Sequence, residues 1–335
     1  MIPKCGFRFL TAGILWLWIS SPVLAADPIL YAAVLSNKRY VVGSDNASTG
    51  LWVSIDLGKT WQCLSWPNVR ASDVAVCPGD SAGTIYMAAG NGVLATRDNG
   101  SHWKILTGWE ITEVQDIEIH PKNRSLVVIG TAYGVYLSED KGSTWEDRSE
   151  GLETRFCSAL QLDRESEDRM WVGTENGVYA TMDRARHWKP AGLEVMAVRV
   201  LVQDPDDPRF LLAGTEDHGV YWSSDNGSTW NPCGGPMRHA TVYDLRFDPR
   251  RSSTVYAGTH GKGVFRTFDC GKTWKRLTGM EGTVVHSLAV VDGEETLLFA
   301  GTVNEGVTCF SESRGKGRWT AAGLPNAQVW AMEVR

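Results

Sequence analysis

Apolar and polar residues follow a recurring four-part pattern along this chain, and residues 114–150 display it most clearly. Residues 114–121 (VQDIEIHP) alternate apolar and polar side chains and stop at a proline, which predicts a half-buried strand. Residues 126–131 (LVVIGT) are almost continuously apolar, as in a strand covered on both faces. Short turns separate two further expected strands, at 135–140 and 144–149. No window after residue 25 has a sustained helical period, so each unit is predicted to be an antiparallel four-stranded meander.

This unit recurs at a nearly constant interval. The segment SIDLGKTW at residues 54–61 has five close copies, and a weaker seventh copy reads SESRGKGRW at residues 311–319. The copies end at Trp61, Trp103, Trp145, Trp188, Trp230, Trp274 and Trp319, in steps of 42 to 45 residues. Such a period indicates one supersecondary unit stacked many times, whereas a linear β-solenoid has much shorter repeats. Meanders repeated around an axis form propellers, usually of about four to eight blades. We predict an all-β, seven-bladed β-propeller.

The two ends of the chain are expected to close this ring together. The first-strand pattern returns in residues 322–335, after the last copy, whereas residues 31–35 (YAAVL) form only a weak first strand. A ring has no exposed edge if strands from both ends share one blade. We therefore predict a closing blade built from the N- and C-terminal strands.

The first 25 residues are predicted to be a signal peptide. Lys4 and Arg8 precede an apolar run, and residues 23–25 provide a small-residue cleavage site. The run is too short to favour a transmembrane helix, so no membrane span is expected in the mature chain. Residues 26–335 are then one exported propeller domain. Its expected location is the periplasm or the exterior, or the thylakoid lumen in a photosynthetic host.

Charge and cysteine content exclude some functions. Without the signal segment, 31 basic residues stand against 39 acidic ones, a net charge of −8, which argues against nucleic-acid binding. No cysteine or histidine cluster has metal-ligand spacing, so we expect no metal and no cofactor. An exported protein can form disulfides, but these cysteines occupy different positions in different repeats. We expect mostly buried free thiols at Cys63, Cys77, Cys157, Cys233, Cys270 and Cys309.

The pattern SxDxGxTW, with a strand pair such as GTAYGVY (residues 130–136) in each unit, resembles the Asp-box (BNR) repeat. Sialidases, sortilin-type receptors and xyloglucan-cleaving glycoside hydrolases carry such repeats. A short exported propeller with a box in every blade is most similar to the Ycf48/HCF136-type photosystem II assembly factors. The resemblance implies that the box is structural and lies away from the binding face.

Residue chemistry agrees with a structural role for the boxes. A carboxylate in a tight turn accepts backbone N–H groups, and the tryptophan offers a large apolar body between blades. Equivalent residues on different blades are spread around a ring, so they cannot converge on one metal or substrate. In the fourth copy Ala185 replaces the turn glycine, and in the seventh Ser313 replaces the aspartate, so either turn could be rearranged. The predicted structural aspartates are Asp56, Asp98, Asp140, Asp183, Asp225 and Asp269.

A binding site is expected where the repeats differ. The second residue of each first strand varies along the chain, whereas a purely structural column would repeat its residue. This column comprises Ser72, Gln115, Ser158, Arg199, Tyr243, His286 and Trp330. Loops expected on the same face, opposite the boxes, add Trp109, Glu110, Glu153, Arg155, Arg238, His239, His260 and Glu305. Aromatic, arginine and histidine side chains gathered in one concavity suit recognition of a peptide or a sugar. The alternative is that these are variable solvated residues at a pore rim.

The sequence favours a binding protein over an enzyme. A glycosidase needs two carboxylates facing one another across the substrate. Candidates are Glu110, Glu113, Glu153, Glu216 and Asp217, but none lies in a supporting motif. We therefore expect a non-catalytic exported scaffold for a protein or polypeptide partner. The alternative is a propeller that binds glycans or hydrolyses them in the manner of a sialidase or another glycoside hydrolase.

Overall fold

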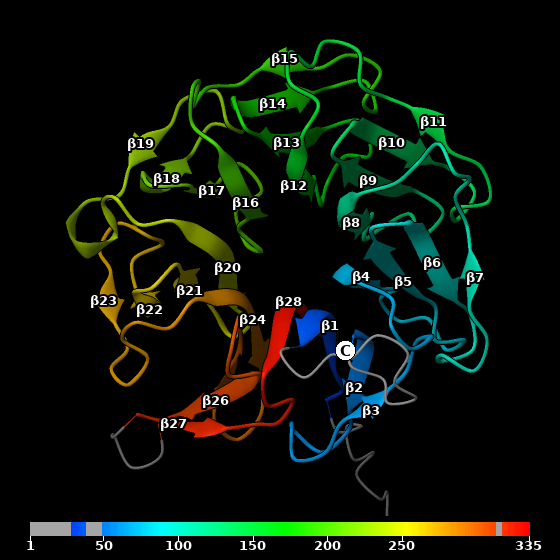
Figure 1. Ribbon diagram of the computed structural model, residues 1–335. Helices are drawn as coiled ribbons and strands as arrows, with labels where there is room; N and C mark the ends of the chain where they lie inside the picture. The colour runs from blue at the N-terminus through cyan, green and yellow to red at the C-terminus, as the bar shows by residue number, and fades with distance from the viewer. Residues whose placement is uncertain (1–27, 38–48, 313–316) are drawn as a thin grey trace, which may run out of the picture.

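In the computed structural model, seven four-stranded antiparallel sheets stand around a central axis as the blades of a β-propeller (Figure 1). The structure describes residues 28–37, 49–312 and 317–335. The predicted signal peptide and Ser313 therefore lie outside the described residues. The predicted fold class and number of blades are confirmed.

Each blade places its first strand nearest the axis and its fourth strand outermost. Blade 1 contains β28 (Ala327–Val334), β1 (Leu30–Asn37), β2 (Gly50–Ser54) and β3 (Gln62–Cys63). Blade 2 contains β4 (Ala71–Val76), β5 (Ile85–Ala89), β6 (Gly92–Thr96) and β7 (Lys104–Ile105). Blade 3 contains β8 (Val114–Ile119), β9 (Val127–Thr131), β10 (Gly134–Ser138) and β11 (Glu146–Asp147).

The remaining blades repeat this order. Blade 4 contains β12 (Cys157–Leu162), β13 (Met170–Thr174), β14 (Gly177–Thr181) and β15 (Lys189–Pro190). Blade 5 contains β16 (Val198–Gln203), β17 (Leu211–Thr215), β18 (Gly219–Ser223) and β19 (Asn231–Pro232). Blade 6 contains β20 (Val242–Asp248), β21 (Arg251–Thr259), β22 (Gly263–Thr267) and β23 (Lys275–Arg276). Blade 7 contains β24 (Val285–Val291), β25 (Leu297–Thr302), β26 (Val307–Ser311) and β27 (Arg318–Ala321).

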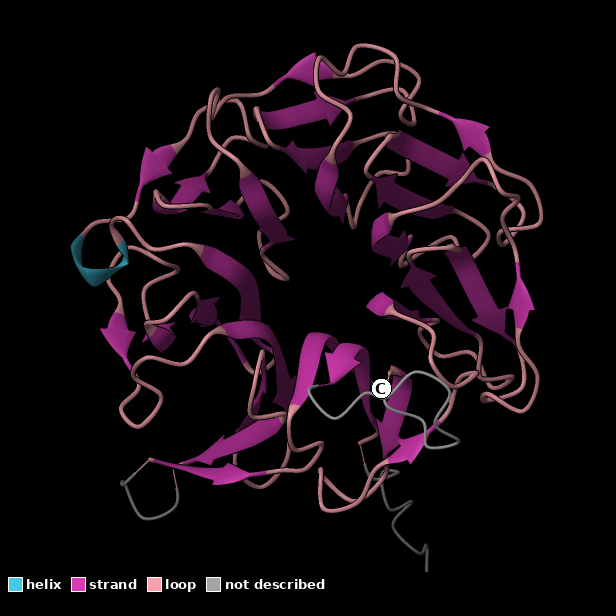
Figure 2. Ribbon diagram, in the orientation of Figure 1, coloured by secondary structure: helices cyan, strands magenta, loops and turns pink. Residues whose placement is uncertain are grey.

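The burial of the strands follows the hydrophobic pattern. The apolar second strands β5, β9, β13 and β17 are buried at every residue. Their side chains pack between neighbouring blades, so the core is a ring of clusters rather than one centre. The fourth strands are shorter than predicted: 144–149 was expected, whereas β11 comprises two exposed residues. Among the described residues, the one helical turn is η1 (Gly235–Met237) (Figure 2), and no helix has the length and apolar character needed to cross a bilayer.

The strands from the two chain ends form blade 1 together, as predicted. β28 pairs with β1 in antiparallel register, with Ala32 opposite Met332 and Ala33 opposite Ala331 (Figure 1). The assignment of residues 31–35 as a first strand was wrong, because β28 takes the axial position and β1 is the second strand. This arrangement pairs both sides of β1, so the ring has no open edge there.

The box turns have the structure expected of turn-stabilising aspartates. Asp140 accepts hydrogen bonds from the Thr144 amide at 2.8 Å, from the Thr144 hydroxyl at 2.7 Å and from the Ser138 hydroxyl at 2.8 Å. Gly142 has φ +81°, where an added Cβ would lie 2.7 Å from Leu106 Cδ1. Equivalent aspartate bonds occur in the other five described boxes. Blade 4 is not rearranged: Ala185 adopts the left-handed φ of 59°, and the His187 amide still donates to Asp183 at 2.9 Å.

Four box tryptophans join neighbouring blades. Trp188 Nε1 donates to the Arg148 carbonyl of the preceding blade at 2.6 Å. Trp61, Trp103 and Trp230 make the same contact, to the carbonyls of Ala322, Leu64 and Ala191. By contrast, Trp274 donates to Gly271 within its own turn, and Trp145 Nε1 has no partner among the described residues. The boxes therefore connect blades as well as turning strands.

This difference between tryptophans predicts unequal stability losses. Trp188→Phe removes a buried indole N–H and leaves the Arg148 carbonyl without its donor, so the free energy of unfolding is expected to fall by about 1–3 kcal/mol. Trp145→Phe, the matched control, removes no hydrogen bond and is expected to cost less than about 1 kcal/mol. Urea unfolding of both variants measures the difference. Equal losses would contradict the interblade role of the Trp188 bond.

The boxes and the variable loops lie on opposite faces. The backbone amide of Lys141, in the box turn, donates to the backbone carbonyl of Ser125, which lies in the loop between the first and second strands of the same blade. Loops that join a blade to the next one contact instead the turns between second and third strands, as in Glu113 N to Gly90 O at 2.9 Å. We call these the box face and the opposite face.

Candidate functional site

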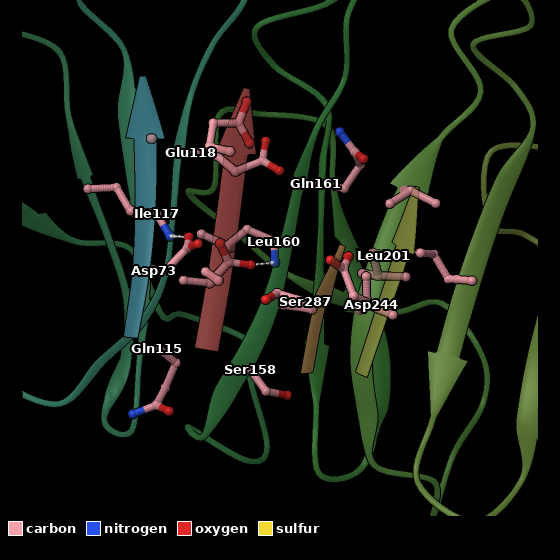
Figure 3. A pocket seen from close by; sticks show the side chains of 18 of the residues that line it. Asp73, Gln115, Ile117, Glu118, Ser158, Leu160, Gln161, Leu201, Asp244 and Ser287 are labelled. Atoms are coloured by element: carbon pink, nitrogen blue, oxygen red, sulfur yellow. Dashed lines mark hydrogen bonds between the residues drawn. The ribbon is translucent and has the colours of Figure 1, made fainter. Parts of the chain in front are cut away.

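A cavity of about 830 Å³ follows the propeller axis. Its walls are the seven first strands, β4, β8, β12, β16, β20, β24 and β28, so every blade contributes to one shared channel. Figure 3 shows part of this lining, with Gln115 and Ser158 at one end, Glu118 and Gln161 at the other, and Asp73, Asp244 and Ser287 between them.

A β-bulge in each first strand sets the chemistry of the channel mouth on the opposite face. The β4–β5 register shifts between Ala71 and Asp73, and the same shift recurs in the other blades. In blades 2 to 7 the extra residue at the bulge is the second residue of the first strand, and in blade 1 it is Trp330, the fourth residue of β28. These residues form the variable column that the sequence singled out. A bulge bends the strand and redirects a side chain, which is why these residues line the channel instead of the interblade core.

Three members of this column stack on one another. The rings of Tyr243 and His286 lie 4.0 Å apart and 14° from parallel, and those of His286 and Trp330 lie 3.9 Å apart and 24° from parallel. The Tyr243 hydroxyl lies 3.2 Å from His260 Nδ1. Burial, with the neighbouring His260 adding to it, lowers the pKa of His286 to about 4, so its ring is neutral near pH 7. We call Tyr243, His286 and Trp330 the aromatic stack.

The other predicted column residues have internal partners. Arg199 forms a short ion pair with Glu216, and Gln115 Nε2 donates to the Glu113 carbonyl at 2.9 Å. Ser72 and Ser158 donate to carbonyls of the next blade's first strand at 2.6 Å. These side chains hold the mouth together, so the aromatic stack, whose three residues are partly exposed, is the part of the column left for apolar contact.

The predicted loop residues lie outside the stack. The Trp109 side chain is 91% exposed, and Arg238 is exposed beside η1. Arg155 lies 3.4 Å from the Tyr133 carbonyl and 3.5 Å from Asp147. Trp66, Tyr133 and Val195, which the sequence analysis did not single out, are also exposed apolar residues in loops of the opposite face. This face therefore carries scattered aromatic side chains around the channel mouth.

Sequence reasoning missed an acidic layer below the mouth. Asp73, Asp116 and Asp244 occupy the third position of their strands and each accept an amide of the next blade, at 3.0, 2.6 and 2.7 Å (Figure 3). Glu118 accepts the Leu162 amide at 3.2 Å, and Glu333 lies deeper in the same channel. The sequence does contain a polar residue next to the bulge position in β4, β8 and β20. However, the alternation of apolar and polar residues did not show that this side chain faces the axis.

These carboxyl groups are partly or fully buried in the channel wall, and the channel admits water. Burial raises the pKa of Asp73, Asp116, Asp244 and Glu333, and the charge of Asp116 adds to the rise at Asp73. Burial, with Asp116 nearby, raises the pKa of Glu118 to about 8. Arg246 is the one guanidinium between the mouths among the described residues, and the charge of Asp244 raises its pKa.

The carboxylates considered for glycosidase chemistry are partly engaged elsewhere. Glu216 pairs with Arg199, and Asp217 Oδ1 accepts the Thr241 hydroxyl at 2.8 Å. Within the described ranges, no group of three or more potential ligands is arranged to hold a metal ion, and the six cysteines are free thiols. The arrangement best suited to ligand contact is the aromatic stack above an acidic channel.

Comparisons with known proteins agree on the fold and divide on activity. No protein-family model matches the chain. A probable oligoxyloglucan-reducing end-specific xyloglucanase from Neosartorya fischeri is 30% identical over 146 residues, which is 38% of this chain and 18% of that enzyme. The chain thus matches less than a fifth of the length of this curated relative.

The similar solved structures include a xyloglucanase and a peptide-bound propeller. The GH74 xyloglucanase from Xanthomonas campestris superposes with a TM-score of 0.66 at 14% identity, covering 87% of this chain and 52% of the enzyme. YCF48 bound to D1 peptide superposes with a TM-score of 0.57 at 16% identity, covering 76% of this chain and 84% of YCF48. At these identities the likeness establishes the propeller fold and leaves function to the site.

Proposed function

We propose that this protein is a non-catalytic propeller scaffold that binds a polypeptide partner at the channel mouth on the opposite face. The aromatic stack of Tyr243, His286 and Trp330 is the observation that carries the proposal. Stacked rings beside an open channel give large apolar contact area with little loss of side-chain freedom, the feature of binding hot spots. Export through residues 1–25 and an assembly-factor role like that of Ycf48-type proteins belong to the same proposal.

Two further observations support a polypeptide ligand. Exposed apolar side chains on the opposite face, including Trp109 and Tyr133, extend the contact area beyond the stack. A propeller of similar size, YCF48, has been solved with a bound peptide. The box face is dominated by turns whose polar atoms bond to one another, as at Asp140.

Partner capture with matched variants tests this proposal. Immobilised protein is incubated with the exported fraction of its host, and retained proteins are quantified for wild type, Tyr243→Ala, Trp330→Ala and the box-face control Ile55→Ser. Each mouth variant is expected to retain its partner roughly tenfold less well, as for a hot-spot residue. Ile55, which is 68% exposed on the box face, is expected to have no effect. Circular dichroism establishes that each variant is folded. An unchanged set of partners in both mouth variants would overturn the proposal.

Glycan binding or hydrolysis is the second candidate, favoured by the similarity to a xyloglucanase. Stacked aromatic rings also suit sugar rings. Incubation with xyloglucan oligosaccharides, chromogenic glycosides and sialosides is expected to give no turnover. Turnover that Glu110→Gln or Glu153→Gln abolishes would establish the enzyme instead.

A further inference from the structure

The charge balance of the channel points to the chemistry of what enters it. Five carboxyl groups line the channel between its mouths: Asp73, Asp116, Glu118, Asp244 and Glu333. Arg246 contacts Asp244 at 3.2 Å and Glu333 at 3.6 Å. Asp73, Asp116 and Glu118 have no Lys, Arg or His nitrogen within ion-pair distance among the described residues. Each accepts a backbone amide, and the carboxyl groups of Asp73 and Asp116 also hydrogen-bond to each other. The channel therefore has an excess of acidic groups.

The walls strengthen the effect of this excess. The channel is open to water, because the Glu333 side chain remains 34% exposed and that of Arg246 37% exposed. It is also lined by packed strands, and low-dielectric walls concentrate the field of charges inside a cleft. Burial, followed by the charge of Asp116, raises the pKa of Asp73 and of Glu118, so Glu118 keeps its proton near pH 7. A cation that enters the channel would favour the ionised form of these carboxyl groups and be attracted by it.

Trp330 stands at one end of the aromatic stack and is partly exposed. His286 on β24 covers one face of Trp330, and no second ring stacks on the other face among the described residues. β28 lies between β24 and β4 around the axis, so the strand on the side of Trp330 away from His286 is β4, which carries Asp73. A cation over a tryptophan face is attracted by its π-system, and a carboxyl group nearby adds to the attraction. His286 is neutral near pH 7 and does not repel a cation.

We propose that the channel mouth binds a cationic side chain, Arg or Lys, of the polypeptide partner, with its charge against Trp330 and Asp73. The inference rests on the proposed function, because it names the chemistry recognised at that site. An acidic segment is disfavoured because Arg199, the basic residue of the mouth column, is already paired with Glu216. A bare metal ion is disfavoured because the described residues offer no group of ligands for one.

The test compares peptides that differ only in charge. The purified protein is titrated by calorimetry with acetyl-Gly-Ser-Gly-Arg-Gly-Ser-Gly-amide, with the same peptide carrying citrulline, which is nearly isosteric and neutral, and with a Glu version. A xyloglucan heptasaccharide is the carbohydrate arm. The variants are Trp330→Leu, Asp73→Asn and the control Ile55→Ser. Asp73→Asn keeps an oxygen acceptor for the Ile117 amide, and Ile55 is exposed in a box turn, on the face away from the channel mouth.

The Arg peptide is expected to bind roughly tenfold more tightly than the citrulline peptide. Trp330→Leu and Asp73→Asn are expected to reduce that ratio towards one, whereas Ile55→Ser leaves it unchanged. The inference would be overturned by equal affinity for the Arg and citrulline peptides or by tighter binding of the Glu peptide. It would also be overturned if the Arg peptide failed to bind at millimolar concentration, or if only the heptasaccharide bound. If Trp330→Ala abolishes partner capture while Arg and citrulline peptides bind equally, cation recognition is wrong and the proposed function stands. If captured partners are unchanged, the proposed function itself fails.

Discussion

Removal of residues 327–335 is expected to abolish the folded propeller. β28 supplies the axial strand of blade 1, and its Val329 and Met332 side chains are fully buried. Its loss exposes one edge of β1 and uncovers the sides of β24 and β4 that face it around the ring. Each buried Val or Met contributes roughly 1.5–3 kcal/mol, and a domain is stable by only about 5–15 kcal/mol. The shortened chain should lose its cooperative thermal transition in calorimetry.

Single substitutions in the same strand provide a graded version of this test. Met332→Ala leaves a cavity next to β1 and is expected to lower the free energy of unfolding by about 2–5 kcal/mol. Gln328→Ala is the control, because it removes only the exposed Ser36 hydrogen bond at 2.6 Å and should cost less than about 1 kcal/mol. A shortened chain that unfolds with the wild-type midpoint would show that β28 does not close the ring.

Stability is expected to be greatest near pH 4–5 and to fall on both sides. On the acid side, hydrogen bonds from Thr60 hold the pKa of Asp56 at about 2, and those from His102 hold the pKa of Asp98 at about 2. An unfolded aspartate titrates near about 3.9, so the folded state binds fewer protons there and loses stability as pH falls from about 4 to 2.

On the neutral side the sign is reversed. Glu118 keeps its proton in the folded state up to about pH 8 and loses it near about 4.3 when unfolded. The folded state therefore binds more protons between these values, and stability falls as pH rises through this window. The slope for one group approaches about 1.4 kcal/mol per pH unit. Asp73 and Asp116, whose pKa values are also raised, change stability in the same direction.

Glu118→Gln isolates the contribution of one channel carboxyl. The substitution removes the titrating group and is expected to flatten the loss of stability between pH 5 and 8, while leaving the acid limb unchanged. Glu294→Gln, on an exposed loop far along the chain, serves as the control. Urea midpoints measured from pH 3 to pH 9 give both limbs. Parallel curves for wild type and Glu118→Gln above pH 5 would show that burial of Glu118 does not cost stability.

The repeated features of this fold could be predicted from the sequence because each depends on local residue chemistry. The tryptophan interval gave the number of blades, and the apolar run at 126–131 identified the fully buried second strand β9. The box aspartates were recognised as turn residues because a carboxylate, a hydroxyl and a glycine at fixed offsets can satisfy one another locally. These interactions hardly depend on the rest of the molecule.

The site could be predicted only in part, because it depends on how blades meet. The varied column singled out Tyr243, His286 and Trp330, which line one channel mouth, but their stacking requires three blades at fixed angles. The bulge beside this column has no residue signature of its own, so the acidic layer at Asp73 and Asp116 was not foreseen. Arg199 was expected to face a ligand. It also forms an ion pair with Glu216, which follows the next strand of the same blade and was not expected as its partner.

Hydroxyl-radical footprinting of the protein with its captured partner tests the central claim most directly. Tyr243 and Trp330 at the channel mouth, and Trp109 around it, should be oxidised several-fold less in the complex than in the free protein. Ile55, Met182 and Phe268, exposed at the box turns, should be oxidised equally in both. Protection of these three box-face residues, with Tyr243 and Trp330 unchanged, would contradict a partner site at the channel mouth.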